Sequence, residues 1–333
     1  MSWSTIRGQD LAVDLLRREL VSDRVAHAYL FTGPAGVGKR RAAMVLAMSL
    51  NCLDPAGDGS PCGICRSCRE LSADPPVHPD VMVVEPEGRF IKTEQMRTVQ
   101  TEVYARPSEG RTRVIIIDEA ERLNAEAGNR LLKVLEEPPA YARFILLTRN
   151  PAGVLPTILS RCQIVHFAPL PPELIAPIVQ EQAGTGPAEA RLFASLSGGS
   201  VGAALALAGN PVVGQRRGEA LDLLLRLDEM DDAALLEQAE ALEKQKEGLD
   251  AWLEMLTLWL RDGLLIAQEA PDRLIVNGDR LDEVRRLAVR YGAGSLMEML
   301  ESVSKARGQL LRNANTRLVL DVLLLNLHSA AHP

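Results

Sequence analysis

The segment GPAGVGKRR, residues 33–41, restricts the possible folds of this chain more than any other stretch. It follows the apolar run AYLFTG and precedes the helical pattern KRRAAMVLAMSLN. A strand, a glycine-rich turn and a helix, in that order, form the context of the phosphate-binding loop G-x-x-x-x-G-K-[ST]. Glycines let backbone N–H groups turn toward a phosphate, the helix N-terminus adds positive potential, and the lysine reaches the β and γ phosphates. The sequence therefore predicts phosphate contacts from Gly33, Gly36, Gly38 and Lys39.

Arg40 stands where this motif has Ser or Thr, whose hydroxyl holds Mg²⁺. A guanidinium has donors but no lone pair, so it cannot be a ligand of the ion and would repel it. Without Mg²⁺, the main neutraliser of charge on the transferred phosphoryl group is lost. We expect a nucleotide-binding shape without hydrolysis. The alternative is that water fills the missing ligand position and slow turnover persists.

Four further apolar runs follow the loop, at residues 80–86, 113–121, 143–151 and 163–172, with helical patterns at 93–105 and 124–139. This alternation is typical of a parallel sheet flanked by helices. Thr93 and Asn124 are expected to cap the two helices, and two prolines end the second one. The predicted fold class is α/β and similar to that of the P-loop NTPases.

Polar residues end two of these runs where a nucleotide site would need them. Asp118 ends the run VIIID, where a second Mg²⁺ contact is expected, and Glu119 is placed to polarise an attacking water. Thr148 and Asn150 close the next run, where a γ-phosphate sensor would lie.

Four of the five cysteines lie in one window with the spacing C-x₉-C-x₂-C-x₂-C, at Cys52, Cys62, Cys65 and Cys68. Four thiolates with short spacers suit a tetrahedral structural zinc, and the turn formers of LDPAGDGSP let the chain double back. An iron–sulfur cluster is the main alternative, but its run would want Cys-Pro three residues on, where this chain reads CRELSADPP. A redox dithiol is a further alternative. Loss of the metal is expected to unfold this module and not the α/β core.

After residue 172 the patterns are helical, with a predicted linker at NPVVG, residues 210–214. The apolar faces of these helices are wide, which fits either a plain helical bundle or a bundle that also packs against neighbouring subunits.

Charge and hydropathy exclude several classes of protein. The net charge is −7, from 37 basic and 44 acidic residues, so the chain has no bulk basic footprint for nucleic acid. No apolar run approaches the ~18 to 20 residues of a membrane span. The N-terminus has no secretory pattern, so we predict a cytoplasmic protein with no membrane partner.

The segments IRGQDLAVDLLRRELVSDRVAHAYLFTGPAGVGKRRAA, DEAERLNAEAGNRLLKVLEEPP and ILSRCQIVHFAPLPP resemble the bacterial DNA polymerase III clamp loader, a family of AAA+ proteins. The resemblance covers nearly all of residues 4–210 and is weaker in the tail, where NANTRLVLDVLLLNL is similar to the last collar helix of the family. It implies an AAA+ domain at 1–168 with a zinc module at 52–68, a helical lid at 169–210 and a helical collar at 211–333. It also implies gamma/tau motor subunits and a delta subunit as partners, and a sliding clamp and primer-template DNA met through the complex.

Within this family the chain resembles the delta-prime subunits more than the motors. Besides Arg40, it has Gly202 in SGGSVGAALALA, where the motor subunits resemble GSxRxAL with a nucleotide-sensing arginine. These departures imply a stator without its own ATPase activity. Lys39, Asp118 and Glu119 are present, so binding of ATP or ADP stays open.

The resemblance also assigns a role to the sequence LSRC, residues 159–162. The arginine of this Ser-Arg-Cys motif points across a subunit interface in the family. It would place Arg161 on the γ-phosphate of a neighbouring motor subunit, a contribution typically worth ~10³ to 10⁵ in rate. Cys162 is then expected to be a small buried apolar residue.

Two other functions remain as alternatives. One is an active gamma/tau-like ATPase that tolerates Arg40. The other is a zinc-dependent nucleic-acid-binding module with a vestigial fold.

Overall fold

The computed structural model describes residues 1–73, 75–244, 248–312 and 314–332. The chain forms two compact units, which are described separately. One consists of Met1–Ile175 and Gly198–Ala203, and the other of Ala176–Ser197 and Ala204–Pro333.

A five-stranded sheet forms the centre of the first unit. Its strands are β1 (Ala28–Thr32), β2 (Val81–Val84), β3 (Arg113–Ile117), β4 (Ala142–Thr148) and β5 (Gln163–His166). Their order is β2-β3-β4-β1-β5, and all four neighbouring pairs are parallel. The carboxyl ends of β1, β3 and β4 therefore lie at one edge, where ligands bind in open sheets of this kind. The predicted parallel α/β sheet is confirmed.

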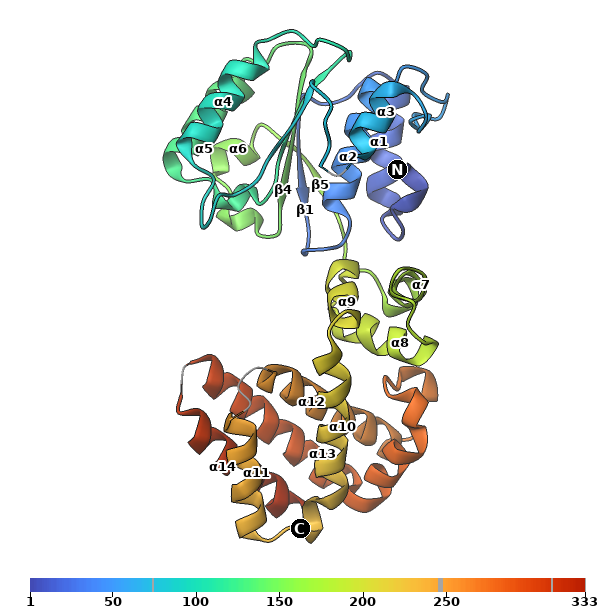
Figure 1. The fold of residues 1–333 in the computed structure, drawn as a ribbon, viewed down its shortest axis with the longest axis vertical. Coiled ribbons are helices and arrows are strands. Elements are labelled where there is room, and N and C mark those ends of the chain that lie inside the picture. The colour runs from blue at the N-terminus through green and yellow to red at the C-terminus, as the bar shows by residue number, and fades with distance from the viewer. Residues whose placement is uncertain (74, 245–247, 313, 333) are drawn as a thin grey trace. The chain divides into compact units, whose positions relative to one another are not determined.

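Helices cover both faces of this sheet (Figure 1). One face carries α1 (Asp10–Val21), α2 (Lys39–Asn51) and α3 (Arg66–Ser72), and the other carries α4 (Thr93–Val103), α5 (Ala125–Glu136) and α6 (Pro156–Leu159). The short 3-10 helices of this unit are η1 (Trp3–Thr5), η2 (Ala120–Arg122) and η3 (Pro151–Gly153). With both faces covered, every residue of β1 and β3 is buried, which explains their continuous apolar runs.

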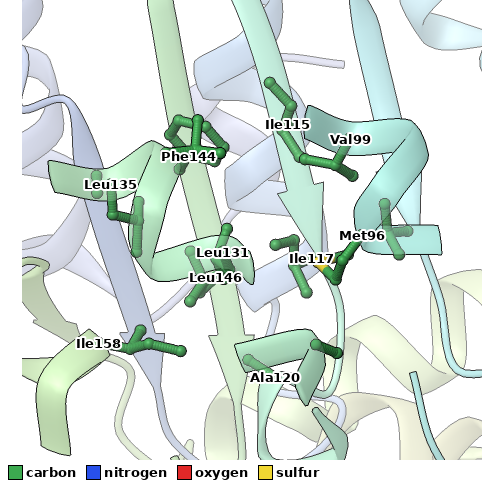
Figure 2. Packing of buried hydrophobic residues seen from close by; sticks show 14 of the residues in the cluster. Met96, Val99, Ile115, Ile117, Ala120, Leu131, Leu135, Phe144, Leu146 and Ile158 are labelled. Carbon is green, nitrogen blue, oxygen red and sulfur yellow. The ribbon is translucent and has the colours of Figure 1, made fainter. Parts of the chain in front are cut away.

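Apolar side chains fill the layer between the sheet and α4, α5 and α6, as Figure 2 shows. Phe144 and Leu146 of β4 face Leu131 and Leu135 of α5 there, and all four are buried. Burying one such side chain is worth about 1.5–3 kcal/mol, so this layer holds the strand ends in fixed positions.

The two predicted helix caps have different outcomes. Asn124 caps α5, because its Oδ1 accepts the backbone N–H of Ala127 at 2.8 Å. The prediction for Thr93 is wrong, since Thr93 is the first residue of α4 and Lys92 is its N-cap. The backbone N–H of Lys92 is instead satisfied by Oε1 of Gln95 at 2.8 Å.

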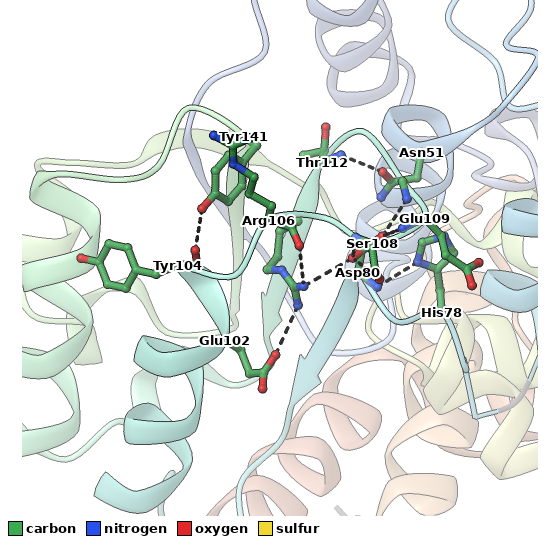
Figure 3. Close-up of polar contacts among 12 residues, drawn as sticks. Asn51, His78, Asp80, Glu102, Tyr104, Arg106, Ser108, Glu109, Thr112 and Tyr141 are labelled. Atoms are coloured by element: carbon green, nitrogen blue, oxygen red, sulfur yellow. Dashed lines mark hydrogen bonds and ion pairs between the residues drawn. The ribbon is translucent and has the colours of Figure 1, made fainter.

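Asp80 anchors the loop that leads into β3, and Figure 3 shows its contacts. Its carboxylate is fully buried and accepts the backbone N–H groups of Ser108, Glu109 and Gly110 at 2.7, 2.8 and 2.7 Å. Arg113 Nη2 lies 3.4 Å from Oδ1 of the same carboxylate. A buried charge is tolerated here because each contact compensates its desolvation.

The described residues after β5 form helices and turns. The helices are α7 (Pro172–Ala183), α8 (Pro187–Leu196), α9 (Val201–Ala208), α10 (Pro211–Arg226), α11 (Asp232–Lys244), α12 (Leu249–Ala267), α13 (Leu281–Leu311) and α14 (Thr316–Ala331), with short 3-10 helices η4 (Leu227–Glu229), η5 (Asp272–Leu274) and η6 (Gly278–Arg280). The predicted linker at 210–214 is wrong, because α10 begins at Pro211 and Oδ1 of Asn210 accepts the N–H of Val212 at 3.1 Å. The division into domains at 1–168, 169–210 and 211–333 stays a prediction.

In the second unit α12 packs against α10 and α13, and α14 packs against α11 and α13. Trp259 of α12 is fully buried, and its indole N–H donates to the carbonyl of Arg217 at 3.1 Å. The Arg217 guanidinium lies 5.2 Å from the Trp259 ring centre and pairs with Asp279. Among the described residues, none of the helices has both the length and the apolar character that a membrane crossing requires.

Candidate functional site

Two glycines of the phosphate loop occupy positions that only glycine fits. Gly33 has a φ of 144°, and a Cβ there would lie 2.1 Å from the carbonyl oxygen of Phe167. Gly36 has a φ of 70°, and a Cβ there would lie 2.3 Å from Ser200 Oγ. The N–H of Gly202 donates to the carbonyl of Gly36 at 3.2 Å. The segment that contains Gly202 therefore touches the loop by its backbone.

Lys39 is the first residue of α2 and points back into the loop. Its Nζ donates to the carbonyls of Gly33 and Pro34 at 2.6 and 2.5 Å, and the residue is only 8% exposed. Burial lowers the pKa of Lys39, against the opposing charge of Asp118. The ammonium group of Lys39 therefore bonds carbonyls of its own loop.

An open cavity of about 400 Å³ lies beside the loop, at the carboxyl ends of the strands. Most of the residues predicted to contact nucleotide line it. Its lining consists of Ala35, Gly36, Gly38, Lys39, Arg40, Arg41, Asp118, Glu119, Glu121, Leu147, Thr148 and Arg149. The structure thus brings together the loop, Asp118, Glu119 and Thr148, whereas Gly33 lies outside this lining.

Arg40 turns toward the acidic strand ends. Its Nη1 lies 3.3 Å from Oδ2 of Asp118 and also bonds Oε1 of Glu85, the residue that follows β2. The side chains of Arg40 and Glu85 are about half exposed, and that of Asp118 is 25% exposed. A guanidinium therefore contacts the carboxylate that was predicted to face Mg²⁺.

Glu119 is paired with arginines as well. Its carboxylate lies 3.3 Å from Arg149 Nη2 and 3.0 Å from Arg122 Nε. Its backbone is left-handed, with a φ of 47°, and its N–H donates to Oδ1 of Asp118 at 2.9 Å. Sequence reasoning missed Arg149, although it stands between the two selected residues Thr148 and Asn150.

Thr148 is buried and its hydroxyl donates to Oε2 of Glu121 at 2.7 Å. The backbone N–H of Asn150 donates to the same hydroxyl oxygen at 3.1 Å. Asn150 itself is exposed and lies just after β4. Glu121, a second residue that the sequence did not single out, therefore accepts the hydrogen bond that a phosphate-sensing hydroxyl would donate to a phosphate.

Arg161 lies on the turn between α6 and β5. Its Nη2 is 2.8 Å from Oε1 of Glu136, and its Nη1 donates to the carbonyl of Thr157 at 3.1 Å. The side chain is 36% exposed. The guanidinium is thus at the surface and held by contacts within its own chain.

The four cysteines of the window lie together. Their Sγ atoms are all within 4.8 Å of one another, and those of Cys52 and Cys68 are 3.7 Å apart. Tetrahedral zinc with Zn–S bonds of about 2.3 Å needs sulfur atoms roughly 3.8 Å apart, so this set of four thiols fits a zinc ion. Cys52 follows α2, Cys65 caps α3, and the turn between them is tied to Trp3, whose indole N–H donates to the carbonyl of Gly59 at 3.2 Å.

The environments of the cysteine thiols differ. The backbone N–H groups of Ile64 and Cys65 lower the pKa of Cys62 to about 7, whereas burial raises the pKa of Cys52. Cys162 packs against the core of the sheet, and burial raises its pKa to about 12. The cluster could hold a metal ion, and Cys162 has no place in it.

Comparison with known proteins decides the family. A family model described as "DNA polymerase III, delta subunit" matches residues 8–171, and one described as "DNA polymerase III, delta subunit, C terminal" matches residues 215–329. DNA polymerase III subunit delta' of Bacillus subtilis is 33% identical over 331 residues, which is 98% of each chain. The chain belongs to the DNA polymerase III delta' family. The resemblance read from the sequence is thereby confirmed, as is the α/β sheet followed by helices.

Other relatives include both delta' and gamma/tau subunits. The delta' subunit of Pseudomonas aeruginosa is 32% identical over 92% of this chain and 93% of its own. The gamma/tau subunit of Mycobacterium tuberculosis H37Rv is 32% identical over 98% of this chain but only 61% of its own length. A gamma subunit-related protein of Thermotoga maritima aligns in structure over 96% of this chain and 99% of its own, with 20% identity and a TM-score of 0.44.

Proposed function

We propose that this delta' family member is a stator of the DNA polymerase III clamp loader, which places a sliding clamp on primer-template DNA. Its partners are gamma/tau motor subunits and a delta subunit. Its own pocket does not hydrolyse ATP, and Arg161 acts on the γ-phosphate bound by a neighbouring motor subunit. The names of its relatives support membership in the complex, and the pocket supports the passive role.

The observation that carries the passive role is the pairing of both acidic residues with arginines. Phosphoryl transfer needs an acidic residue that holds Mg²⁺ and another that positions water. Here Asp118 contacts Arg40 at 3.3 Å and Glu119 contacts Arg149 at 3.3 Å. Exposed ion pairs of this kind contribute only about 0–1 kcal/mol of stability. Although these ion pairs add little stability, they should block hydrolysis, because each places a cation where the reaction needs a free carboxylate.

The exposure and placement of Arg161 support its action in trans. It lies on a surface turn, and its contact with Glu136 is a half-exposed ion pair that costs little to break. A guanidinium that reaches a neighbour's γ-phosphate stabilises the charge that develops during transfer. Glu136 would then position the side chain until the neighbour binds.

The proposal also includes a structural zinc ion, with Cys52, Cys62, Cys65 and Cys68 as its four ligands. When bound, the ion would cross-link the end of α2 to α3. All four sulfurs are committed, so no coordination position remains for catalysis. No observation on the described part of the chain favours a gamma/tau-like ATPase or a nucleic-acid-binding module.

Reconstitution with the motor and delta subunits tests the proposal. Arg161→Ala should leave assembly intact and reduce the burst of ATP hydrolysis that follows addition of clamp and primed DNA. The part of the burst that should be lost is the part contributed by the motor subunit next to this chain. Arg97→Ala is the matched control, because Arg97 is 60% exposed on α4 and pairs with Glu94 of the same helix. An unchanged burst with Arg161→Ala would contradict the proposed role.

A further inference from the structure

The guanidinium of Arg40 lies where a phosphate loop needs a cation. It is on the second residue of α2, beside Lys39, and it lines the cavity together with Arg41 and Arg149. The lining holds four basic side chains and three carboxylates. The lining therefore has a formal excess of one positive charge, which the carboxylate of Glu85 offsets as long as it bonds Arg40.

Arginine can replace part of what Mg²⁺ does for a bound polyphosphate. A guanidinium is planar, permanently charged and able to donate two parallel hydrogen bonds to phosphate oxygens. Both carboxylate contacts of Arg40 run through Nη1, as far as the described residues show, so Nη2 and Nε keep their N–H groups for a ligand. Arg40 cannot coordinate water molecules as Mg²⁺ does. A polyphosphate held by Arg40 should therefore bind without being hydrolysed.

Glu85 is the competitor for this guanidinium. Its side chain is 51% exposed, and an exposed ion pair is a weak one. A di- or triphosphate brings several negative charges to the same place and also meets the N-terminus of α2. The phosphate chain should therefore displace Glu85 from Arg40.

We propose that this pocket binds the polyphosphate chain of a nucleotide without Mg²⁺, with Arg40 in the place of the ion. The inference rests on the proposed function only in treating the pocket as non-hydrolysing. It adds a ligand class, nucleotide polyphosphates, and a condition, the absence of Mg²⁺. An ordinary phosphate-loop protein would release its nucleotide when Mg²⁺ is removed, whereas this pocket would keep it bound.

Calorimetric titration of the full chain with ADP, ATP and inorganic triphosphate, each in EDTA and in excess Mg²⁺, tests this. We expect wild-type Kd values for ADP and ATP to be similar in the two conditions. Arg40→Ser should weaken binding in EDTA by about tenfold or more, since a hydrogen-bonded charge is lost, and Mg²⁺ should restore it because serine is a ligand. Glu85→Gln should tighten binding in EDTA, and Arg97→Ser should leave it unchanged.

Failure to bind in EDTA, or binding by the wild type only with Mg²⁺, would overturn the proposal. If Arg40→Ser does not fold, Glu85→Gln carries the test, and weaker or unchanged binding by that variant counts against the proposal. Inorganic triphosphate that binds as well as ATP would identify the phosphate chain alone as the ligand, and weaker triphosphate binding would identify the nucleotide. Either result leaves the Arg161 experiment in the complex unaffected, so the two proposals fail separately.

Discussion

The ion pair between Arg40 and Asp118 joins residues 78 positions apart, and the proposed passive role depends on it. The sequence predicted the consequence of Arg40 from its chemistry, because a guanidinium cannot be a metal ligand. It did not predict that Arg40 pairs with Glu85 or that Glu119 pairs with Arg149. Those contacts depend on which strand ends are neighbours in the sheet, and one sequence does not contain that information.

At the same scale, Asp80 provides a test of the first unit that does not involve the pocket. Burial acts to raise the pKa of Asp80, but the N–H groups of Gly110, Ser108 and Glu109 act in the opposite direction, and the net result is a lowered pKa. The carboxylate therefore stabilises the fold above the unfolded pKa of about 4, and this stabilisation is lost as the pH falls through the lower folded value.

Asp80→Asn should reduce the free energy of unfolding by about 3 kcal/mol near neutral pH, because the buried charge is lost and one acceptor oxygen becomes an NH2 donor that faces backbone N–H groups. The difference between wild type and variant should shrink as the pH falls to ~3, since below the unfolded pKa of about 4 the unfolded wild type takes up a proton that the folded carboxylate binds less readily. Urea unfolding followed by circular dichroism at both pH values measures this. A difference that is constant with pH would show that the charge of Asp80 is not what stabilises the loop.

At the scale of elements, the helix-capping rule predicted a helix start correctly where a single side chain satisfies the free N–H. Asn124 caps α5 because a short side-chain acceptor at that position satisfies a free N–H. The same rule misplaced the cap of α4 by one residue, because Gln95 satisfies the N–H of Lys92 and lets the helix begin at Thr93. NPVVG was predicted as a linker from its Asn, Pro and Gly, yet Asn210 and Pro211 are a cap and a first turn.

The cysteine cluster is the element whose stability should depend on metal. We expect the purified chain to contain about one zinc, and its removal by a chelator to expose residues 52–68 to protease while the sheet keeps its circular dichroism signal. Cys68→Ser should reproduce this loss because Cys68 is a buried member of the cluster. Cys162→Ala is the control, since that thiol packs against the core of the sheet.

Metal analysis and limited proteolysis read out both effects. A chain that folds normally and never binds zinc would contradict the assignment. Iron with visible absorbance would favour the iron–sulfur alternative.

At the scale of the whole molecule, the sequence predicted the five strands of the sheet, because parallel strands buried on both faces are continuous apolar runs. The fold class and the delta' family are confirmed, whereas the three domain boundaries and the roles of the site residues stay predictions. The exposed helix faces of the second unit gave no comparable signal. Leu318, Val322 and Leu325 of α14 are exposed, but nothing in one chain shows what covers them.

The central claim is that this chain binds into an ATP-driven complex without hydrolysing ATP itself. The most direct measurement is phosphate release from ATP and Mg²⁺ by the isolated wild-type chain, compared with Lys39→Ala prepared in the same way. We predict equal rates, both at the level of trace contamination. A faster wild-type rate that depends on Mg²⁺ and is lost with Lys39→Ala would show that the pocket is a working ATPase and would contradict the claim.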